Sequence, residues 1–102
     1  MDITNRDRRQ LKALAHHLDP VVRVGRNGVT ATVTGETERA LDAHELIKIR
    51  IDAESGKERR DAATRLCEAV GAALVGTVGK IAIVYRPHPE KPVIRLNGGS
   101  SR

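Results

Sequence analysis

Apolar residues recur at three- and four-residue intervals in three segments of the chain, which is the spacing of an amphipathic helix. This spacing predicts helices over residues 5–17, about 31–43 and about 57–70. The side chains expected to face the core are Leu11, Leu14, Ala15 and Leu18 in the first helix, Val33, Thr37, Ala40 and Leu41 in the second, and Ala63, Leu66, Cys67 and Val70 in the third.

Local signals mark the ends of these helices. Thr4 and Asp7 resemble a capping box before the first helix, and Thr30 is a suitable N-terminal cap for the second. Pro20 ends the first helix, because proline disfavours helical backbone angles in the residue before it. Gly71 suits the C-terminal cap of the third helix.

Four shorter runs predict strands. These runs are Val21–Val24, Leu46–Ile51, Ala73–Val78 and Ile81–Tyr85. In the second run isoleucines alternate with Lys48 and Arg50, so one side of that strand is apolar and the other is basic. Residues 93–96 are a candidate for an additional short edge strand.

The last two strands are separated by Gly79-Lys80, a pair that suits a two-residue type II′ hairpin turn. The turn aligns Val78 with Ile81, Gly76 with Ile83, and Leu74 with Tyr85. We therefore expect an antiparallel hairpin in which Tyr85 is a structural residue at the sheet edge.

The order of the elements is α-β-α-β-α-β-β, which predicts an α/β fold. Two strand–helix–strand crossovers predict parallel neighbouring strands, and the final hairpin is antiparallel. The sequence therefore predicts a mixed four-stranded sheet with three helices. We expect one domain over residues 1–96 and a flexible tail at residues 97–102.

Composition narrows the classes of partner. The 102 residues include 18 Lys+Arg, 13 Asp+Glu and one aromatic residue, Tyr85, and the net charge is +5. Residues 1–28 and 86–102 each carry a net +3, whereas residues 29–85 carry −1. This excess of basic charge favours a polyanionic partner. RNA-recognition motifs and oligonucleotide-binding barrels stack bases on aromatic side chains, so this chain is expected to hold nucleic acid by charge and backbone instead.

A single cysteine, Cys67, excludes an internal disulfide and a multi-thiolate metal site, and it is expected to pack in the core. Residues 1–15 lack the apolar core of a secretory signal, and no run approaches the ~20 apolar residues of a membrane span. We expect a cytoplasmic protein that acts as a monomer and has no membrane partner.

The loop Gly25-Arg26-Asn27-Gly28 lies where a predicted strand leads into a predicted helix. Two glycines let the backbone turn tightly and approach a ligand closely, and a helix N-terminus attracts an anion. Arg26 can pair with a phosphate, and KH domains clamp nucleic-acid backbone with a G-x-x-G loop of this type. The alternative is a structural turn that accepts any polar pair in the middle.

Further basic residues have two interpretations. Lys48 and Arg50 share one face of a strand, which is either a basic surface beside the loop or the solvated face of a half-buried strand. The same choice applies to Arg9 and Lys12 on the first helix, and Lys80 is either a contact or simply exposed in its turn.

The titratable residues do not form a recognisable catalytic motif. His44-Glu45 is best interpreted as a polar pair at a helix end, because adjacent residues point to different sides. His16-His17 lacks the i, i+4 spacing of a helical zinc pair. We therefore expect no enzymatic activity, no metal, no cofactor and no small-molecule substrate.

Several segments together resemble the CRM-domain family, in particular its small stand-alone YhbY-type bacterial RNA-binding members. The segments are Leu11–His16, Pro20–Val22, Gly25–Thr30, Ala40-Leu41, His44–Ile49, Gly79-Lys80 and Tyr85–Pro87, and they follow the family's order across residues 3–96. The resemblance implies a fold like the C-terminal domain of a bacterial translation initiation factor. It also implies RNA contacts at the Gly25–Gly28 loop, with Lys12, Lys48 and Lys80 as basic companions.

The same resemblance implies a function in ribosome assembly, through ribosomal RNA in precursors of the large subunit (pre-50S particles). A different hypothesis is a protein-interaction module that docks on ribosomal proteins and contacts RNA only incidentally. A small enzyme that uses His44 and Glu45, or a protein that lies on a membrane surface, has weaker support in the sequence.

Overall fold

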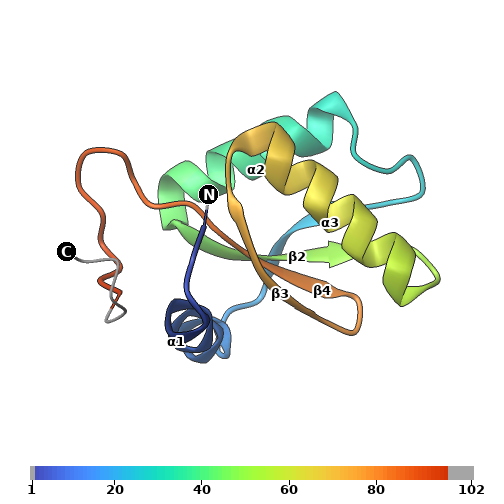
Figure 1. The fold of residues 1–102 in the computed structure, drawn as a ribbon. Coiled ribbons are helices and arrows are strands. Elements are labelled where there is room, and N and C mark those ends of the chain that lie inside the picture. The colour runs from blue at the N-terminus through green and yellow to red at the C-terminus, as the bar shows by residue number, and fades with distance from the viewer. Residues whose placement is uncertain (1, 97–102) are drawn as a thin grey trace.

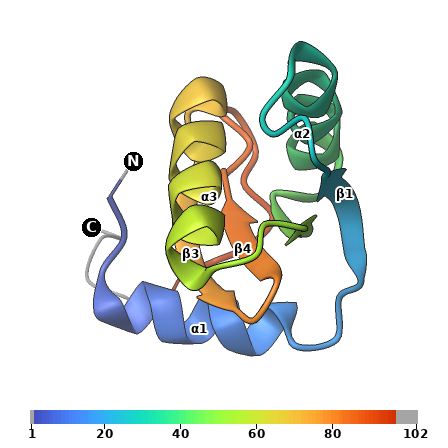
Figure 2. The ribbon, with the colours of Figure 1, turned by 90° about the vertical axis from the view of Figure 1, so that its right-hand side faces the viewer.

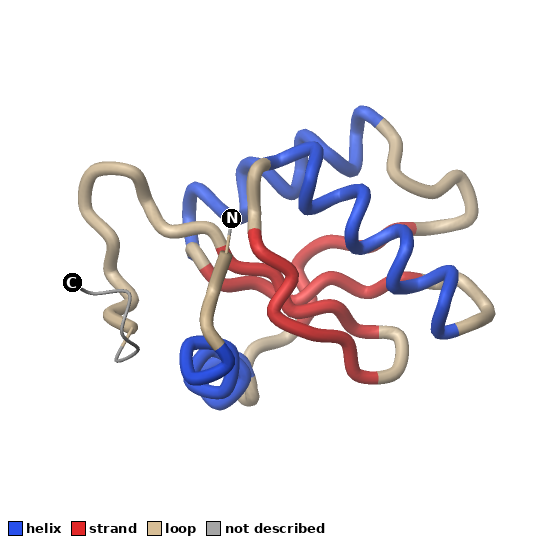
Figure 3. The backbone as a smooth tube through the Cα atoms, viewed as in Figure 1, coloured by secondary structure: helices blue, strands red, loops and turns tan. Residues whose placement is uncertain are grey.

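The computed structural model describes residues 2–96, and these form three helices and a four-stranded mixed sheet (Figures 1 and 3). The elements are α1 (Asn5–Ala15), β1 (Pro20–Val24), α2 (Ala31–His44), β2 (Leu46–Ile51), α3 (Gly56–Val70), β3 (Ala73–Val78) and β4 (Ile81–Tyr85). This order confirms the predicted fold class. Both expected N-terminal caps, at Thr4 and Thr30, are present, and a further capping box joins Ser55 to Glu58 before α3.

The strand order in the sheet is β1-β2-β4-β3. β1 and β2 are parallel neighbours, as the first crossover predicts, and β4 is antiparallel to both β2 and β3. The second crossover does not join neighbours, because β4 lies between β2 and β3. β4 suits an interior position since its residues 82–85 are all buried, whereas β3 carries exposed or half-buried positions and forms an edge.

The β3–β4 hairpin follows the predicted register only next to its turn. Gly79 has a φ of +58° and Lys80 has no positive φ, which is the pattern of a type II′ turn. The pairs Val78–Ile81 and Gly76–Ile83 are present, but Leu74 pairs with Val84, and Ala73 pairs with Tyr85. The register shifts between Leu74 and Gly76, so the predicted Leu74–Tyr85 pair is wrong. Tyr85 is buried in an interior strand, which makes it a packing residue but not one at the sheet edge.

Helices cover the two sheet faces unequally. α2 and α3 pack on one face, over a core that includes Val24, Leu41, Ile49 and Leu66. α1 crosses the other face alone, where its buried residues meet a second cluster of Leu46, Val75, Ile83 and Tyr85 (Figure 2). Part of this second face therefore has no helix above it.

The buried side of α1 differs from the predicted one. The helix ends at Ala15 instead of residue 17, and its buried residues are Asp7, Leu11 and Ala15. Leu14 and Leu18, expected in the core, remain 47% and 37% exposed. α1 covers only one end of the sheet, so only a narrow stripe of its side chains is buried in the contact with the strands.

Residues 86–96 follow β4 without forming the edge strand expected at 93–96. They return to α1, where Ile94 and Leu96 pack against the second cluster, and Gln10 Nε2 donates a hydrogen bond to the carbonyl of Arg95 at 2.6 Å. The flexible tail expected at 97–102 lies outside the described residues.

Candidate nucleic-acid interface

The Gly25–Gly28 loop is a tight turn between β1 and α2. The N–H of Gly28 donates to the carbonyl of Gly25 at 3.1 Å, and Arg26 and Asn27 are exposed at the centre of the turn. Gly28 has a φ of +75°, which favours glycine there. Gly25 has no positive φ, and a Cβ at that position would meet no atom within 4 Å. The fold therefore explains the second glycine of the motif but not the first.

The N-terminus of α2 follows the loop directly. Thr30 Oγ1 accepts a hydrogen bond from the N–H of Val33 at 3.2 Å, and the first turn of the helix carries no acidic residue. The remaining N–H groups of the first turn and the helix dipole attract an anion. The loop and the helix start can thus act together on a phosphate group.

Three loops meet at this end of the sheet: Gly25–Gly28, the 52–55 connection and the Gly79-Lys80 turn (Figure 1). The N–H of Ile51 donates to the carbonyl of Lys80 at 2.7 Å, and the N–H of Asp52 donates to the carbonyl of Val24 at 3.0 Å. Lys80 therefore belongs to the same end of the molecule as the loop, although 52 positions separate it from Gly28.

The uncovered part of the second sheet face is basic. In the register of the parallel strands β1 and β2, Arg23 lies next to Arg50. Both side chains point away from the core under α2 and α3. Lys48 lies on the same face, where its Nζ is 3.5 Å from the carbonyl oxygen of His16 at the end of α1. Lys12 reaches this face from α1. We call Lys12, Arg23, Lys48 and Arg50 the basic face.

The predicted site residues fall into two groups. Arg26 and Asn27 lie in the loop with Lys80 at the same end of the sheet, and Lys12 and Lys48 lie on the basic face. Arg9 is exposed on α1, one helical turn before Lys12. It stays a prediction from helix spacing alone.

Asp52 is a residue that the sequence reasoning missed. Its Oδ2 accepts from Nε of Arg23 at 2.5 Å, and its Oδ1 accepts from Nε of Arg50 at 3.0 Å. The hydrogen bond from Arg23, and secondarily that from Arg50, holds the pKa of Asp52 below its ordinary value of 3.8. The spacing of Arg50 and Asp52, two residues apart at the end of β2, could have suggested their pair, whereas the Arg23 contact spans 29 residues.

One side of the loop is acidic. A hollow of about 570 Å³ separates the loop from the start of α3, and four of its lining side chains are carboxylates. These are Asp52, Glu54, Glu58 and Asp61. An anionic strand is expected to approach the loop tip from the basic face, because this hollow would repel it.

The His44-Glu45 pair has a structural role. His44 is exposed, whereas Glu45 is only 4% exposed and its carboxylate accepts hydrogen bonds from the N–H groups of His88, Val93 and Ile94. Burial alone would raise the pKa of Glu45, but these three backbone donors lower it below 4.5. The carboxylate is thereby used to hold residues 86–96 and is not available as a catalytic base.

Within residues 2–96, no three His, Cys, Asp or Glu side chains lie close enough together to hold a metal ion. No helix in the same range has the length and apolar character needed to cross a membrane. Cys67 is buried in the core as expected, and this burial raises the pKa of its thiol to about 11.

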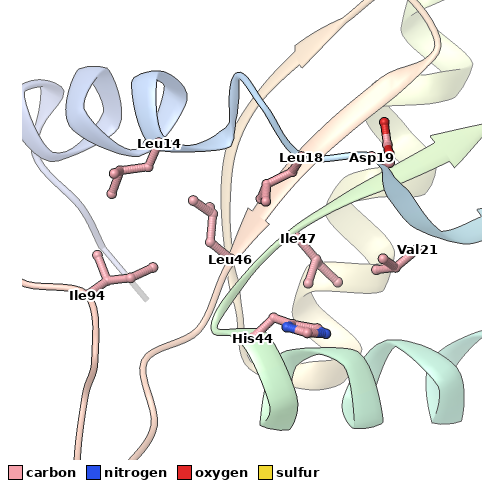
Figure 4. Close-up of a pocket in the computed structure, with 8 residues that line it drawn as sticks. All are labelled: Leu14, Leu18, Asp19, Val21, His44, Leu46, Ile47 and Ile94. Carbon is pink, nitrogen blue, oxygen red and sulfur yellow. The ribbon is translucent and has the colours of Figure 1, made fainter.

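An apolar pocket of about 370 Å³ lies at the opposite end of β1 from the loop (Figure 4). Leu14 of α1 and Leu18 of the connection after it face Val21 and Leu46 across the pocket, and Ile94 from the C-terminal segment forms a further wall. Asp19, His44 and Ile47 complete the lining. The pocket explains why Leu14 and Leu18 remain exposed, and it is separate from the basic face.

The chain is similar to known proteins in both sequence and fold. The family model described as the CRS1 / YhbY (CRM) domain matches residues 3–86. A probable RNA-binding protein of Pseudomonas aeruginosa is 41% identical over 90 residues, which cover 88% of this chain and 86% of that protein. An RNA-binding protein of Haemophilus influenzae is 37% identical over 91 residues, 89% of this chain and 92% of the other. The solution structure of a Staphylococcus aureus protein described as an RNA-binding candidate has a TM-score of 0.83 at 28% identity, covering 93% of this chain and 99% of that one.

Proposed function

The chain belongs to the CRS1 / YhbY (CRM) domain family, and on that basis we propose that it binds RNA through the Gly25–Gly28 loop and the adjoining basic face. RNA binding is the property named for its bacterial relatives. The loop supplies backbone N–H groups and Arg26 to phosphate, and the basic face supplies four further cations.

The observation that carries the proposal is a glycine that the fold itself does not need, directly beside an exposed arginine. Gly25 occupies open space with no positive φ, so its lack of a side chain is best explained by the close approach of a ligand backbone. Arg26 is exposed beside it, and Lys80 lies at the same end of the sheet. The single aromatic residue is buried, which leaves phosphate contact as the main source of affinity.

We further propose that the RNA is ribosomal and is carried by precursors of the large ribosomal subunit, where the protein acts in assembly. The resemblance of the sequence to YhbY-type proteins supports this assignment. In this role the protein is a cytoplasmic monomer without catalytic activity, and it requires no cofactor or metal.

The test compares Arg26→Ala with the wild-type protein on several structured RNAs across a salt series. Loss of one phosphate contact weakens binding to all of the RNAs alike and lowers the slope of log affinity against log salt by about 1. Arg60→Ala is the matched control, because Arg60 is an exposed arginine on α3 that lines neither the hollow beside the loop nor the basic face. Equal binding by the Arg26→Ala and wild-type proteins would exclude a role for the loop.

Sedimentation from cell lysate tests the ribosomal assignment. The wild-type protein is expected with particles smaller than the mature large subunit, and Arg26→Ala is expected to be depleted from them. Association that survives about 1 M salt would instead favour docking on ribosomal proteins, because exposed charges are screened at that concentration.

A further inference from the structure

A second hollow lies on the basic face, between α1 and the β3–β4 hairpin. Its volume is about 330 Å³, at the lower end of the ~300–1,000 Å³ typical of small-ligand pockets. Its lining divides into a polar rim, Lys12, His16 and Lys48, and an apolar floor, Val78, Ile81 and Ile83.

The rim places two ammonium groups beside the floor. Lys12 extends from α1 over β3, where a Cβ at Gly76 would lie 2.8 Å from its Cε and 3.3 Å from its Nζ. Lys48 comes from β2, and its Nζ points to the end of α1 at His16. Gly76 therefore lets the end of the Lys12 side chain lie directly on the edge strand.

The apolar floor of the hollow is unusually exposed to solvent. Val78 is 66% exposed although it is paired with Ile81, and Ile81 is itself only partly buried. Arg50 pairs with Ile81 from the neighbouring strand, so the floor is continuous with the basic face. An exposed apolar area surrounded by cations is suited to a ligand with one flat apolar part and one anionic part.

We propose that this hollow receives a single unstacked nucleotide of the bound RNA, an inference that rests on the proposed RNA-binding function. The base lies on Val78 and Ile81, and the phosphate next to it is held by Lys12 and Lys48. Unstacked bases are held between apolar as well as aromatic side chains, so aliphatic groups can replace the aromatic platform that this chain lacks. A base in a continuous duplex is stacked on both sides and cannot enter.

A pocket for one unstacked nucleotide predicts a preference for bulged over fully paired RNA, which phosphate contacts alone do not produce. The wild-type protein should bind an RNA hairpin with one bulged nucleotide several times more tightly than the same hairpin fully paired. Val78→Ser should weaken binding to the bulged RNA about fivefold and leave binding to the paired RNA unchanged, because only apolar contact with the base is lost. Val93→Ser is the matched control, because Val93 is an 82% exposed valine on the C-terminal segment, outside the hollow.

Gly76→Ala provides an independent variant. The added methyl group displaces the flexible end of Lys12, so the fold is retained while the ammonium group moves. The preference for the bulged RNA should fall in this variant as well. Circular dichroism and thermal unfolding of each variant are the check that the fold is intact.

The two proposals fail in different ways. Equal affinity of the wild-type protein for both RNAs, or a preference that Val78→Ser and Gly76→Ala leave unchanged, overturns the nucleotide pocket and leaves RNA binding standing. No binding to either RNA overturns both.

Discussion

Oε1 of Glu45 accepts a hydrogen bond from the N–H of Ile94 at 2.9 Å, which joins the end of α2 to a segment 49 residues further along the chain. The same carboxylate accepts from the N–H of His88 at 2.7 Å and from that of Val93. Glu45 is also the only non-glycine residue with a positive φ, +61°, in the described range. A strained, buried residue that holds a long segment in this way identifies residues 86–96 as part of the fold.

Glu45→Gln is expected to loosen this segment. The amide keeps one acceptor oxygen but turns an N–H₂ group toward backbone donors, which should cost about 1–3 kcal/mol of local stability. Arg86 and Lys91 precede prolines, so Arg95 is the readily cleaved tryptic site of residues 86–96. Cleavage after Arg95 should become about tenfold faster, as followed by mass spectrometry.

Glu36→Gln is the control for this experiment, because Glu36 is an exposed glutamate on the same helix. It should leave the cleavage rate unchanged. Equal rates for the wild-type and Glu45→Gln proteins would contradict an anchoring role for the carboxylate.

The stability of the protein should depend on pH through Glu45. Although burial opposes it, hydrogen bonding to the backbone lowers the folded-state pKa of this group below its ordinary value of 4.5. The carboxylate therefore contributes its full stabilisation above about pH 4.5, and the contribution is lost as pH falls through the lower folded-state pKa. Urea unfolding at pH 7 and at successively lower pH should show the difference between wild type and Glu45→Gln shrinking below pH 4.5. A difference that is constant or grows toward acid would refute the assignment.

Asp52→Asn should strengthen RNA binding. Asp52 neutralises part of the basic face by pairing with Arg23 and Arg50, and phosphate must compete with it for both guanidinium groups. Removing its charge should raise affinity a few-fold at low salt and steepen the salt dependence, measured by filter binding. Asp42→Asn is the matched control, because Asp42 pairs with Arg86 near the far end of α2 and lines neither the acidic hollow nor the basic face. Weaker binding by Asp52→Asn would mean that the carboxylate positions the two arginines for RNA.

The two glycines of the loop should respond differently to alanine. Gly28→Ala forces an L-residue to a φ of +75° and should cost about 1–2 kcal/mol of stability. Gly25→Ala meets no neighbouring atom and should leave the urea midpoint unchanged while it weakens RNA binding. If Gly25→Ala binds RNA as well as the wild type, close approach of the ligand backbone at this position is excluded.

The sequence predicted most of the secondary structure because the relevant signals are local. The Leu46–Ile51 strand and the Gly79-Lys80 turn have the predicted bounds, and the cap at Thr4 is formed within three residues. The Ser55–Glu58 capping box was present in the sequence as an S-x-x-E pattern and was missed. α1 was predicted correctly as a helix, but the spacing of its apolar residues could not show which of two overlapping stripes of side chains would be buried.

The candidate site was only partly predictable for the same reason. Arg26 and Asn27 follow from a four-residue motif, and the alternation of Lys48 and Arg50 places them on one strand face. The pairing of Asp52 with Arg23 and the contact of Lys12 with the strand at Gly76 join residues far apart in the chain. No periodic pattern records such contacts.

The amino-acid sequence by itself determined the order of the helices and strands, which loop carries two glycines, and that only one aromatic residue is available for base stacking. Only the tertiary structure decided that β4 separates β2 from β3, that α1 leaves part of a sheet face uncovered, and that Glu45 holds residues 86–96. Caps, turns and alternation depend on neighbours a few residues away. Strand order, helix coverage and the pairing of buried charges depend on how distant surfaces fill space together.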